Sequence, residues 1–281
     1  MKRLFLIFAV ALSAFGCFAK NNNVLRVVSY NVRQCASGEK DPANNWDVRK
    51  PASPAMIREI APDVFGVQEA LPVQLQYILE NAPDYKCVGV GRDDGKSKGE
   101  HMSVFYNTKR IELLDWGTWW LSETPDVPSK GWDAKCFRTA TWTKLRVKAT
   151  GREFFFVNTH LDHIGIQARL NGLNLIIDKI GEMNPNGAPM ILTGDFNMRP
   201  DDPKYASIWE ALNARMTNSR TAAKKSDTKP SYNAWGKRSA IIDYIYFSGM
   251  SSCTSFKVID RQFAGIPYIS DHYPVAAELK F

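Results

Sequence analysis

The sequence predicts an α/β fold, because apolar runs of strand length alternate along the chain with segments of helical periodicity. The clearest helix is predicted over residues 166–183, where leucine and isoleucine recur along one broad face. Residues 154–158 read as a fully apolar strand, which indicates burial on both faces of a sheet. No internal repeat or composition break marks a second domain, so one domain is expected over residues 24–281.

The remaining elements follow the same two patterns. Apolar runs predict strands over residues 24–31, 64–68, 85–90, 103–106, 111–120, 139–147, 189–193, 242–247 and 274–279. Helical spacing predicts short helices over residues 54–60 and 74–79, the second of which follows Pro72. Three loops, residues 91–99, 122–137 and 216–235, are candidate functional segments, because long loops in a compact domain often carry function.

The first 19 residues are predicted to be a secretory signal and not part of the fold. Lys2 and Arg3 precede an apolar stretch over residues 4–15 that is too short to span a bilayer, so no transmembrane segment is expected. Two alternatives remain open: lipidation of Cys17 as a lipoprotein, or cleavage after Ala19 to release a soluble product. Both predict an exported protein that is periplasmic, extracellular or an outer-membrane lipoprotein.

The net charge and the cysteine content exclude few classes of function. The formal net charge is +7, and loss of Lys2 and Arg3 with the signal leaves +7 − 2 = +5. This mildly basic balance suits an anionic substrate but is ordinary for a chain of this size. The cysteines form no C-x-x-C pair and no zinc pattern, so free thiols are expected. We expect a monomer.

Acid, amide and histidine side chains recur where the predicted strands end. They are Asn31, Glu69, His160, Asp195, Asn197, Asp243, Asp271 and His272. Strands that end at one edge of a sheet would project these groups into one cleft. Oxygen ligands together with imidazole are what a hard divalent cation and phosphate chemistry require.

These residues lie in motifs that resemble the endonuclease/exonuclease/phosphatase superfamily, the DNase I-like metal-dependent phosphoesterases. The resemblance runs from Val24 to the end of the chain. In the family's order, the motifs are Ser29-Tyr30-Asn31, Gln68-Glu69, Gly99-Glu100, Asn158-Thr159-His160, Gly194-Asp195-Phe196-Asn197, Ile242-Asp243-Tyr244 and Ser270-Asp271-His272. The resemblance implies a four-layer α/β sandwich of two packed mixed β-sheets flanked by helices.

The resemblance also implies roles for individual residues. Glu69 would be a direct ligand of Mg²⁺ or Mn²⁺, with help from Asn31 and Asp271. Asp195 would orient and deprotonate the attacking water, and Asn197 would bind a phosphate oxygen or the metal. Because these ligands are oxygens and not thiolates or three histidines, Mg²⁺ or Mn²⁺ fits the set better than structural zinc does.

The histidines complete the implied machinery. Asp243 would hydrogen-bond one nitrogen of His272, and raise its pKa, so that His272 meets a phosphoryl oxygen. His160 resembles the histidine that contacts phosphate or protonates the leaving oxygen, and Glu100 the acid that orients it. His163 has no counterpart in the resemblance and is expected to have a structural or surface role.

Five further side chains are candidates for substrate contact. Asn158 belongs to the motif that contains His160, and Arg33 and Arg138 could each reach a phosphate, although ordinary surface pairing is an equal alternative for both arginines. Trp132 and Trp235 lie in two of the long loops, whereas the other tryptophans fit core packing better.

Three functions remain open. The first is a metal-dependent phosphodiesterase or phosphatase that acts on a small or lipid-linked phosphate. The second is a secreted nuclease that degrades extracellular DNA or RNA, for which a basic group at Arg220, Lys224, Lys225, Lys229, Lys237 and Arg238 is a candidate contact. The third is a catalytically silent surface binding protein on the same scaffold, although no predicted metal ligand is missing.

Overall fold

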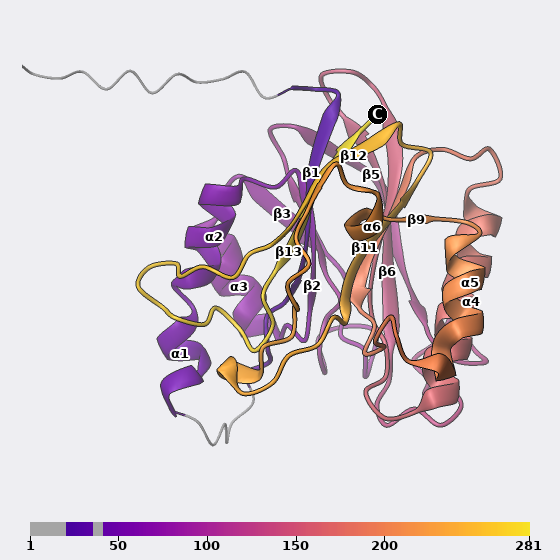
Figure 1. The fold of residues 1–281 in the computed structure, drawn as a ribbon, viewed down its shortest axis with the longest axis horizontal. Helices are drawn as coiled ribbons and strands as arrows, with labels where there is room; N and C mark the ends of the chain where they lie inside the picture. Colours follow the sequence, from indigo (N-terminus) through magenta and orange to yellow (C-terminus); the bar gives the residue numbers. More distant parts are fainter. Residues whose placement is uncertain (1–20, 36–41) are drawn as a thin grey trace, which may run out of the picture.

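The computed structural model describes residues 21–35 and 42–281, which form two β-sheets packed face to face with helices on both outer faces (Figure 1). The predicted four-layer α/β sandwich is therefore confirmed. The predicted signal over residues 1–19, with Cys17, lies outside the described residues. Across the described part of the chain, no helix has the length and apolarity needed to cross a membrane.

The first sheet has seven strands in the order β10-β12-β13-β1-β2-β4-β3. Its strands are β1 (Val24–Asn31), β2 (Val64–Gln68), β3 (Tyr85–Val88), β4 (Val104–Asn107), β10 (Lys225–Ser226), β12 (Ser252–Val258) and β13 (Val275–Lys280). The helices on its outer face are α1 (Trp46–Arg49), α2 (Ala52–Ile60) and α3 (Pro72–Asn81). Pro72 opens α3, where a proline loses no intrahelical hydrogen bond.

The second sheet has six strands in the order β5-β6-β7-β8-β11-β9. Its strands are β5 (Ile111–Trp120), β6 (Thr139–Val147), β7 (Glu153–His160), β8 (Met190–Asp195), β9 (Thr217–Asn218) and β11 (Asp243–Ser248). Helices α4 (Ile166–Met183) and α5 (Ala206–Asn213) cover its outer face, and α6 (Ser219–Ala222) lies beside β11 and β12. Three short 3₁₀ turns lie at Pro42–Asn44, Pro203–Tyr205 and Ala234–Gly236.

Three apolar clusters account for the layers. One lies between the two sheets and includes Phe154, Phe156 and Ile245. A second joins the six-stranded sheet to α4 and α5, and a third joins the seven-stranded sheet to α2 and α3. Strand β7 contributes to both faces of its sheet and is buried from Phe154 onward, so the predicted two-sided burial is confirmed.

Strand direction brings the predicted site residues together. Strands β1 and β2 are parallel in one sheet, and β7 and β8 are parallel in the other. Asn31 at the end of β1 hydrogen-bonds Asp195 at the end of β8, so all four strands end at a shared edge. Strand β13 runs antiparallel to β1, and β11 runs antiparallel to β8, so both begin at that edge. Consequently the residues that follow the first four strands lie beside those at the start of β11 and before β13.

Several elements were not anticipated from the sequence. The structure adds α1, α5 and β12, and extends β7 and β8 to His160 and Asp195. Helix α5 is only eight residues long, so its buried side chains cover too few turns to make a clear period. Polar residues at the ends of β7 and β8 obscure the strand pattern, although they are buried here.

A polar network crosses the interface between the sheets directly beneath the site edge. Asn158 Oδ1 accepts hydrogen bonds from Gln68 Nε2 at 2.6 Å and from Thr193 Oγ1 at 3.1 Å. Asn158 Nδ2 donates to the backbone carbonyl of Val67 at 2.7 Å. The network therefore ties the end of β2, and with it the position of Glu69, to β7 and β8 of the other sheet.

We expect Gly66→Ala to destabilise the protein by about 1–3 kcal/mol, the usual range for overpacking a filled interior. A Cβ at this position would lie 2.2 Å from Asn158 Oδ1 and 2.7 Å from Thr193 Oγ1. Gly172→Ala in α4 is the matched control, because its Cβ would meet Leu121 no closer than 3.4 Å. Thermal unfolding of both variants tests this, and an unchanged midpoint for Gly66→Ala would contradict the packing argument.

Candidate active site

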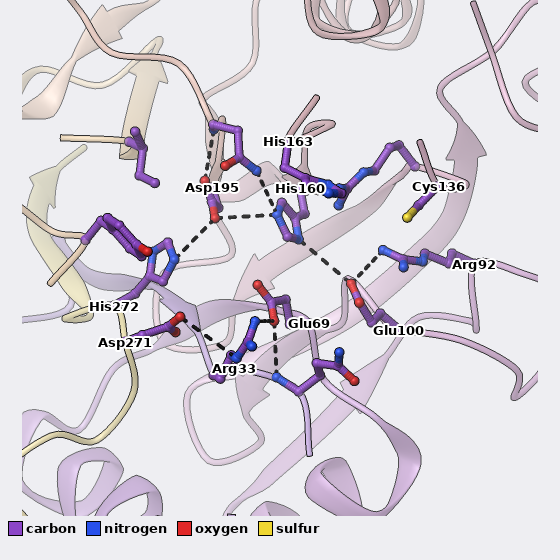
Figure 2. Close-up of a pocket in the computed structure, with 15 residues that line it drawn as sticks. Arg33, Glu69, Arg92, Glu100, Cys136, His160, His163, Asp195, Asp271 and His272 are labelled. Carbon is purple, nitrogen blue, oxygen red and sulfur yellow. Dashed lines mark hydrogen bonds and ion pairs between the residues drawn. The ribbon is translucent and has the colours of Figure 1, made fainter. Parts of the chain in front are cut away.

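A cavity of about 540 Å³ opens at the shared strand edge (Figure 2). Most of the predicted site residues line it: Arg33, Glu69, Glu100, Arg138, His160, Asp195, Asn197, Asp271 and His272. Asn31 and Asp243 do not line the cavity but each hydrogen-bonds a residue that does. The structure therefore brings together all the predicted metal ligands and catalytic residues.

Glu69 follows β2 with a left-handed backbone, φ 63°, which is strained for a residue with a side chain. Asn31 Nδ2 donates to Glu69 Oε1 at 3.0 Å and to Asp195 Oδ2 at 3.1 Å, so it bridges the two sheets. Burial by itself would raise the pKa of Glu69, but Arg33, Asn31 and cationic His272 together lower it. Glu69 is therefore a buried carboxylate that stays charged.

Asp195, His272 and Asp243 form a chain of buried charges. His272 Nδ1 donates to Asp243 Oδ2 at 2.9 Å, and His272 Nε2 lies 3.7 Å from Asp195 Oδ2. Burial opposes the charged imidazole, yet Asp243 and Asp195 raise the pKa of His272 to about 10. Burial raises the pKa of Asp195 to about 7, with His272 lowering it and Asp243 raising it.

His160 lies on the opposite side of Asp195. Its Nε2 is 3.5 Å from Asp195 Oδ2 and accepts a hydrogen bond from Asn197 Nδ2 at 3.0 Å. Its Nδ1 lies 4.0 Å from Glu100 Oε2, which is beyond hydrogen-bond distance. Burial, followed by the charges of Arg138 and Arg92, lowers the pKa of His160 well below its ordinary value, so this imidazole is neutral at pH 7.

Arg33 and Asp271 complete the side of the cavity nearest Glu69. Arg33 Nη1 lies 3.5 Å from Glu69 Oε2, and Arg33 Nε lies 3.9 Å from Asp271 Oδ2. The two carboxylates thus flank one guanidinium. Arg33 has φ 53°, and its backbone N–H donates to Asn31 Oδ1 at 2.9 Å.

Three predicted substrate contacts do not face the cavity. Asn158 is fully buried in the network between the sheets, where it already bonds protein groups. Trp235 packs 5.7 Å from the Arg49 guanidinium and 6.5 Å from the Tyr268 ring, and Trp132 is half-buried outside the cavity lining. The structure therefore does not bring these three side chains into the cavity with the other predicted site residues.

The long loops do reach the cavity, through residues that the sequence did not single out. The three predicted loops contribute Arg92, Cys136 and Tyr232, one from each. His163, expected to have a structural or surface role, also lines the cavity, where it lies 2.8 Å from Arg138. Its spacing of three residues from His160 across a turn was the available sequence signal.

The sequence profile of the Endonuclease/Exonuclease/phosphatase family matches residues 28–272. The chain belongs to this family. A mannosyl-6-phosphatase from Bacteroides thetaiotaomicron is 35% identical, with a TM-score of 0.86 over 92% of this chain and 100% of its own. A Bacteroides vulgatus endonuclease/exonuclease/phosphatase is 34% identical, with a TM-score of 0.84 over 92% and 99%. Nocturnin from Drosophila melanogaster is 22% identical across 91% of this chain but 46% of its own length, so the chain spans about half of that relative.

Within residues 21–35 and 42–281 of this endonuclease/exonuclease/phosphatase chain, two overlapping groups of side chains could hold a metal ion. One comprises Glu69, His160 and Asp195, and the other Asp195, Asp243 and His272, with one ligand atom from each residue within 4.8 Å of the others. Glu69 is common to the first group and to the predicted ligand set. Asp271, which the sequence predicted as a second carboxylate, is in neither group.

Asp162 holds in place the segment of the cavity wall that contains Arg138. Its Oδ2 accepts from Arg138 Nε at 3.1 Å and from the backbone of Lys135 at 3.0 Å, and its Oδ1 accepts from Gly165 N at 2.8 Å. Burial would raise the pKa of Asp162, but backbone donors at Gly165 and Ile164, together with Arg138, hold it well below its ordinary value.

We expect Asp162→Asn to cost about 3–5 kcal/mol at pH 7, the range for breaking a buried ion pair. Because the folded-state pKa is depressed, this carboxylate stabilises the fold above its unfolded pKa, and the contribution is lost as pH falls through the folded pKa. Denaturant unfolding tests this: the loss of stability of Asp162→Asn relative to the wild type should be smaller at pH 3 than at pH 7. Asp178→Asn, at an exposed position of α4, should change stability little at either pH. A deficit of Asp162→Asn that stayed constant between the two pH values would contradict the charge argument.

Proposed function

We propose that this chain is a divalent-metal-dependent phosphoester hydrolase that acts on a small or lipid-linked phosphate by in-line attack of water. The main support is the convergence of Glu69, Asp195, His160 and His272 on one cavity, in a chain of which 92% matches a mannosyl-6-phosphatase. The cavity volume of about 540 Å³ lies within the range of small-molecule sites, about 300–1,000 Å³.

The residues around Glu69 fit a hard divalent cation. Glu69 is a buried carboxylate with a lowered pKa, and Glu69 and Asp271 already flank a cationic group at Arg33. Glu69 would hold Mg²⁺ or Mn²⁺ with help from Asn31 and Asp271. When bound, such an ion supplies positive charge that stabilises the leaving oxygen and the phosphoryl group.

Asp195 is the proposed proton acceptor for the attacking water. A base works best with a pKa near the working pH, and burial raises the pKa of Asp195 to about 7. The backbone N–H of Asn197 donates to Oδ1 at 2.9 Å, while Asn31 donates to Oδ2 at 3.1 Å. These two bonds orient the carboxylate, which leaves it little freedom to turn away from a bound water.

The two histidines take different parts in the proposal. His272 is the cation, held by Asp243, that would meet a phosphoryl oxygen and balance the charge that develops there. His160 is neutral, so it would act as a hydrogen-bonding group and not as a second cation or as the acid that protonates the leaving oxygen. The proposal therefore adopts the first of the two roles that the resemblance implies for His160, contact with phosphate.

A nuclease is the second candidate, because more distant relatives include nocturnins and a probable RNA exonuclease from Saccharomyces cerevisiae, 25% identical over 66% of this chain. The basic group predicted to grip nucleic acid is partly engaged within the fold. Arg220 donates to the carbonyls of Asp227 and Lys229, and Lys229 pairs with Asp260 at 2.6 Å. This engagement favours the small-substrate proposal.

A hydrolysis panel separates these candidates. It comprises mannose 6-phosphate, p-nitrophenyl phosphate, bis-p-nitrophenyl phosphate, sphingomyelin, inositol phosphates, single-stranded RNA and supercoiled plasmid, each with Mg²⁺ or Mn²⁺ and with EDTA. We expect EDTA-sensitive release of phosphate from small esters. Cleavage of RNA or plasmid would instead favour the nuclease, and inactivity of the folded, metal-loaded protein on every substrate would favour the silent binding protein.

Export is part of the proposal, with lipidation at Cys17 and cleavage after Ala19 as its two forms. We propose a monomeric enzyme that meets its substrate outside the cytoplasm. Intact mass of the protein purified from its host distinguishes the two forms, because lipidation adds acyl chains at Cys17. Retention of residues 1–19 in the purified protein would contradict both.

A further inference from the structure

The cavity has two ends of different charge. Glu69, Asp195 and Asp271 lie toward one end, with Arg33 and His272 beside them (Figure 2). Arg92, Glu100 and Cys136 lie toward the other end, and His160 lies between. We call the second group, with Arg138 and His163, the arginine end. Arg138 belongs to it because its Nη2 lies 2.8 Å from His163 Nδ1 and because Asp162 holds both Arg138 and Cys136.

The arginine end has more donors than acceptors. Arg92 Nε, Arg138 Nη1 and His160 Nδ1 are buried nitrogens that have no hydrogen-bond partner among residues 21–35 and 42–281. Glu100 is the only carboxylate among the described residues that line this end, and one Arg92 nitrogen already occupies it at 2.6 Å. A buried donor without an acceptor is costly, so an anion with several oxygens would stabilise this arrangement.

The two ends also influence each other electrostatically. The charges of Arg92 and Arg138 act on the pKa values of Glu100 and His160, and those of Arg33 and His272 act on Glu69 and Asp271. Across the cavity, Glu69 acts on Glu100 and His272 acts on His160. Burial, followed by the charge of Glu69, raises the pKa of Glu100 to about 7. Asp162 already pairs with Arg138 at 3.1 Å, whereas Arg92 bonds Glu100 through Nη1 and has only Asp93, at 3.8 Å, near its Nε. Arg92 is therefore the arginine with more bonding capacity left for an anion.

The geometry points to a second anion-binding subsite at the arginine end, with Arg92 as its specificity-determining residue, and hence to a substrate that carries a second phosphate beyond the one that is hydrolysed. The inference rests on the proposed function, since it places the reacting phosphoryl group at the end that holds Glu69 and Asp195. Arginine suits this task because its planar fork matches phosphate oxygens. The substrate class is a small phosphate ester with a second phosphate on its leaving group.

A binding measurement tests the subsite without turnover. Inorganic phosphate is titrated by calorimetry into the full chain in EDTA, where the carboxylates around Glu69 disfavour an anion at the other end. We expect the wild type to bind, Arg92→Met to weaken binding at least about 10-fold, and Arg92→Lys to fall between. Arg146→Met, which removes an arginine from an exposed ion pair with Glu112, should bind like the wild type. No binding by the wild type, or equal binding by Arg92→Met, would overturn the subsite.

A kinetic measurement tests specificity. The rate of phosphate release from mannose 1,6-bisphosphate is compared with that from mannose 6-phosphate, with Mg²⁺ present. We expect the wild type to prefer the bisphosphate at least about 10-fold in kcat/KM, and Arg92→Met to lose this preference through KM. A wild type without the preference would overturn the second-phosphate assignment. Failure of the proposed function itself looks different: no ester is hydrolysed, while the phosphate titration still shows or refutes the subsite.

Discussion

Glu69→Gln should lower kcat by about two orders of magnitude or more, the effect of removing a main electrostatic stabiliser from a buried site. The substitution keeps the shape of the side chain and the hydrogen bond that Asn31 Nδ2 donates to Oε1. It removes the charge that Arg33 and His272 surround and that the proposed metal requires. Steady-state kinetics on the best small ester, with Mg²⁺ varied, measures the loss.

Two comparisons make the Glu69 result specific. Glu210→Gln, at an exposed position of α5, removes the same charge away from the cavity and should leave kcat unchanged. Raising Mg²⁺ should recover part of the lost rate if Glu69 contributes to metal affinity. Near-normal turnover of Glu69→Gln at every Mg²⁺ concentration would show that Glu69 is not the principal ligand.

Asp195→Asn should lower kcat by about 10²–10⁴-fold, the contribution typical of a positioned general base. An amide is isosteric with the carboxylate but cannot take a proton from water. It would also lie 3.5 Å from His160 and 3.7 Å from His272 without the negative charge that raises the pKa of His272. Single-turnover measurement of phosphate release isolates this loss from product release.

Stability provides the contrast for the Asp195 variant. Because burial raises the pKa of Asp195, its ionised form is disfavoured by the fold, and the neutral amide should not lower the unfolding midpoint greatly. Asp178→Asn is the matched surface control and should retain both rate and midpoint. If Asp195→Asn lost activity only in proportion to unfolded protein, the proton-acceptor role would be wrong.

Side chains at strand ends were predictable because their positions follow from local periodicity. Glu69 directly follows a strand that the sequence marks clearly, and His160, Asp195 and Asp243 lie at the ends of others. Motif order then related these positions to a family whose profile matches the chain. By contrast, Asn158 lies on the same face of β7 as His160, two residues before the strand end. It is therefore buried between the two sheets, where it bonds Gln68 and Val67, and it does not reach the cavity.

Residues on long loops were not predictable to the same degree. The sequence identified the three loops that reach the cavity, yet it favoured Trp132 and Trp235 over Arg92, Cys136 and Tyr232. Aromatic size suggested substrate contact, whereas Trp235 packs against the buried guanidinium of Arg49. A loop side chain takes its direction from contacts made by distant segments, and no local pattern records these contacts.

By itself, the sequence determined the alternation of strands and helices and the identities of the groups at the strand edge, because these depend on periodicity and motif order. The resemblance already implied that Asp243 pairs with His272, but only the tertiary structure decided how the charge states of the two histidines differ. His160 is neutral and His272 is cationic because burial and neighbouring charges act differently on two histidines that are chemically identical. The two ends of the cavity likewise arise because separate loops pack around Glu100. Arg92 hydrogen-bonds this carboxyl group, and the charge of Arg138 lowers its pKa.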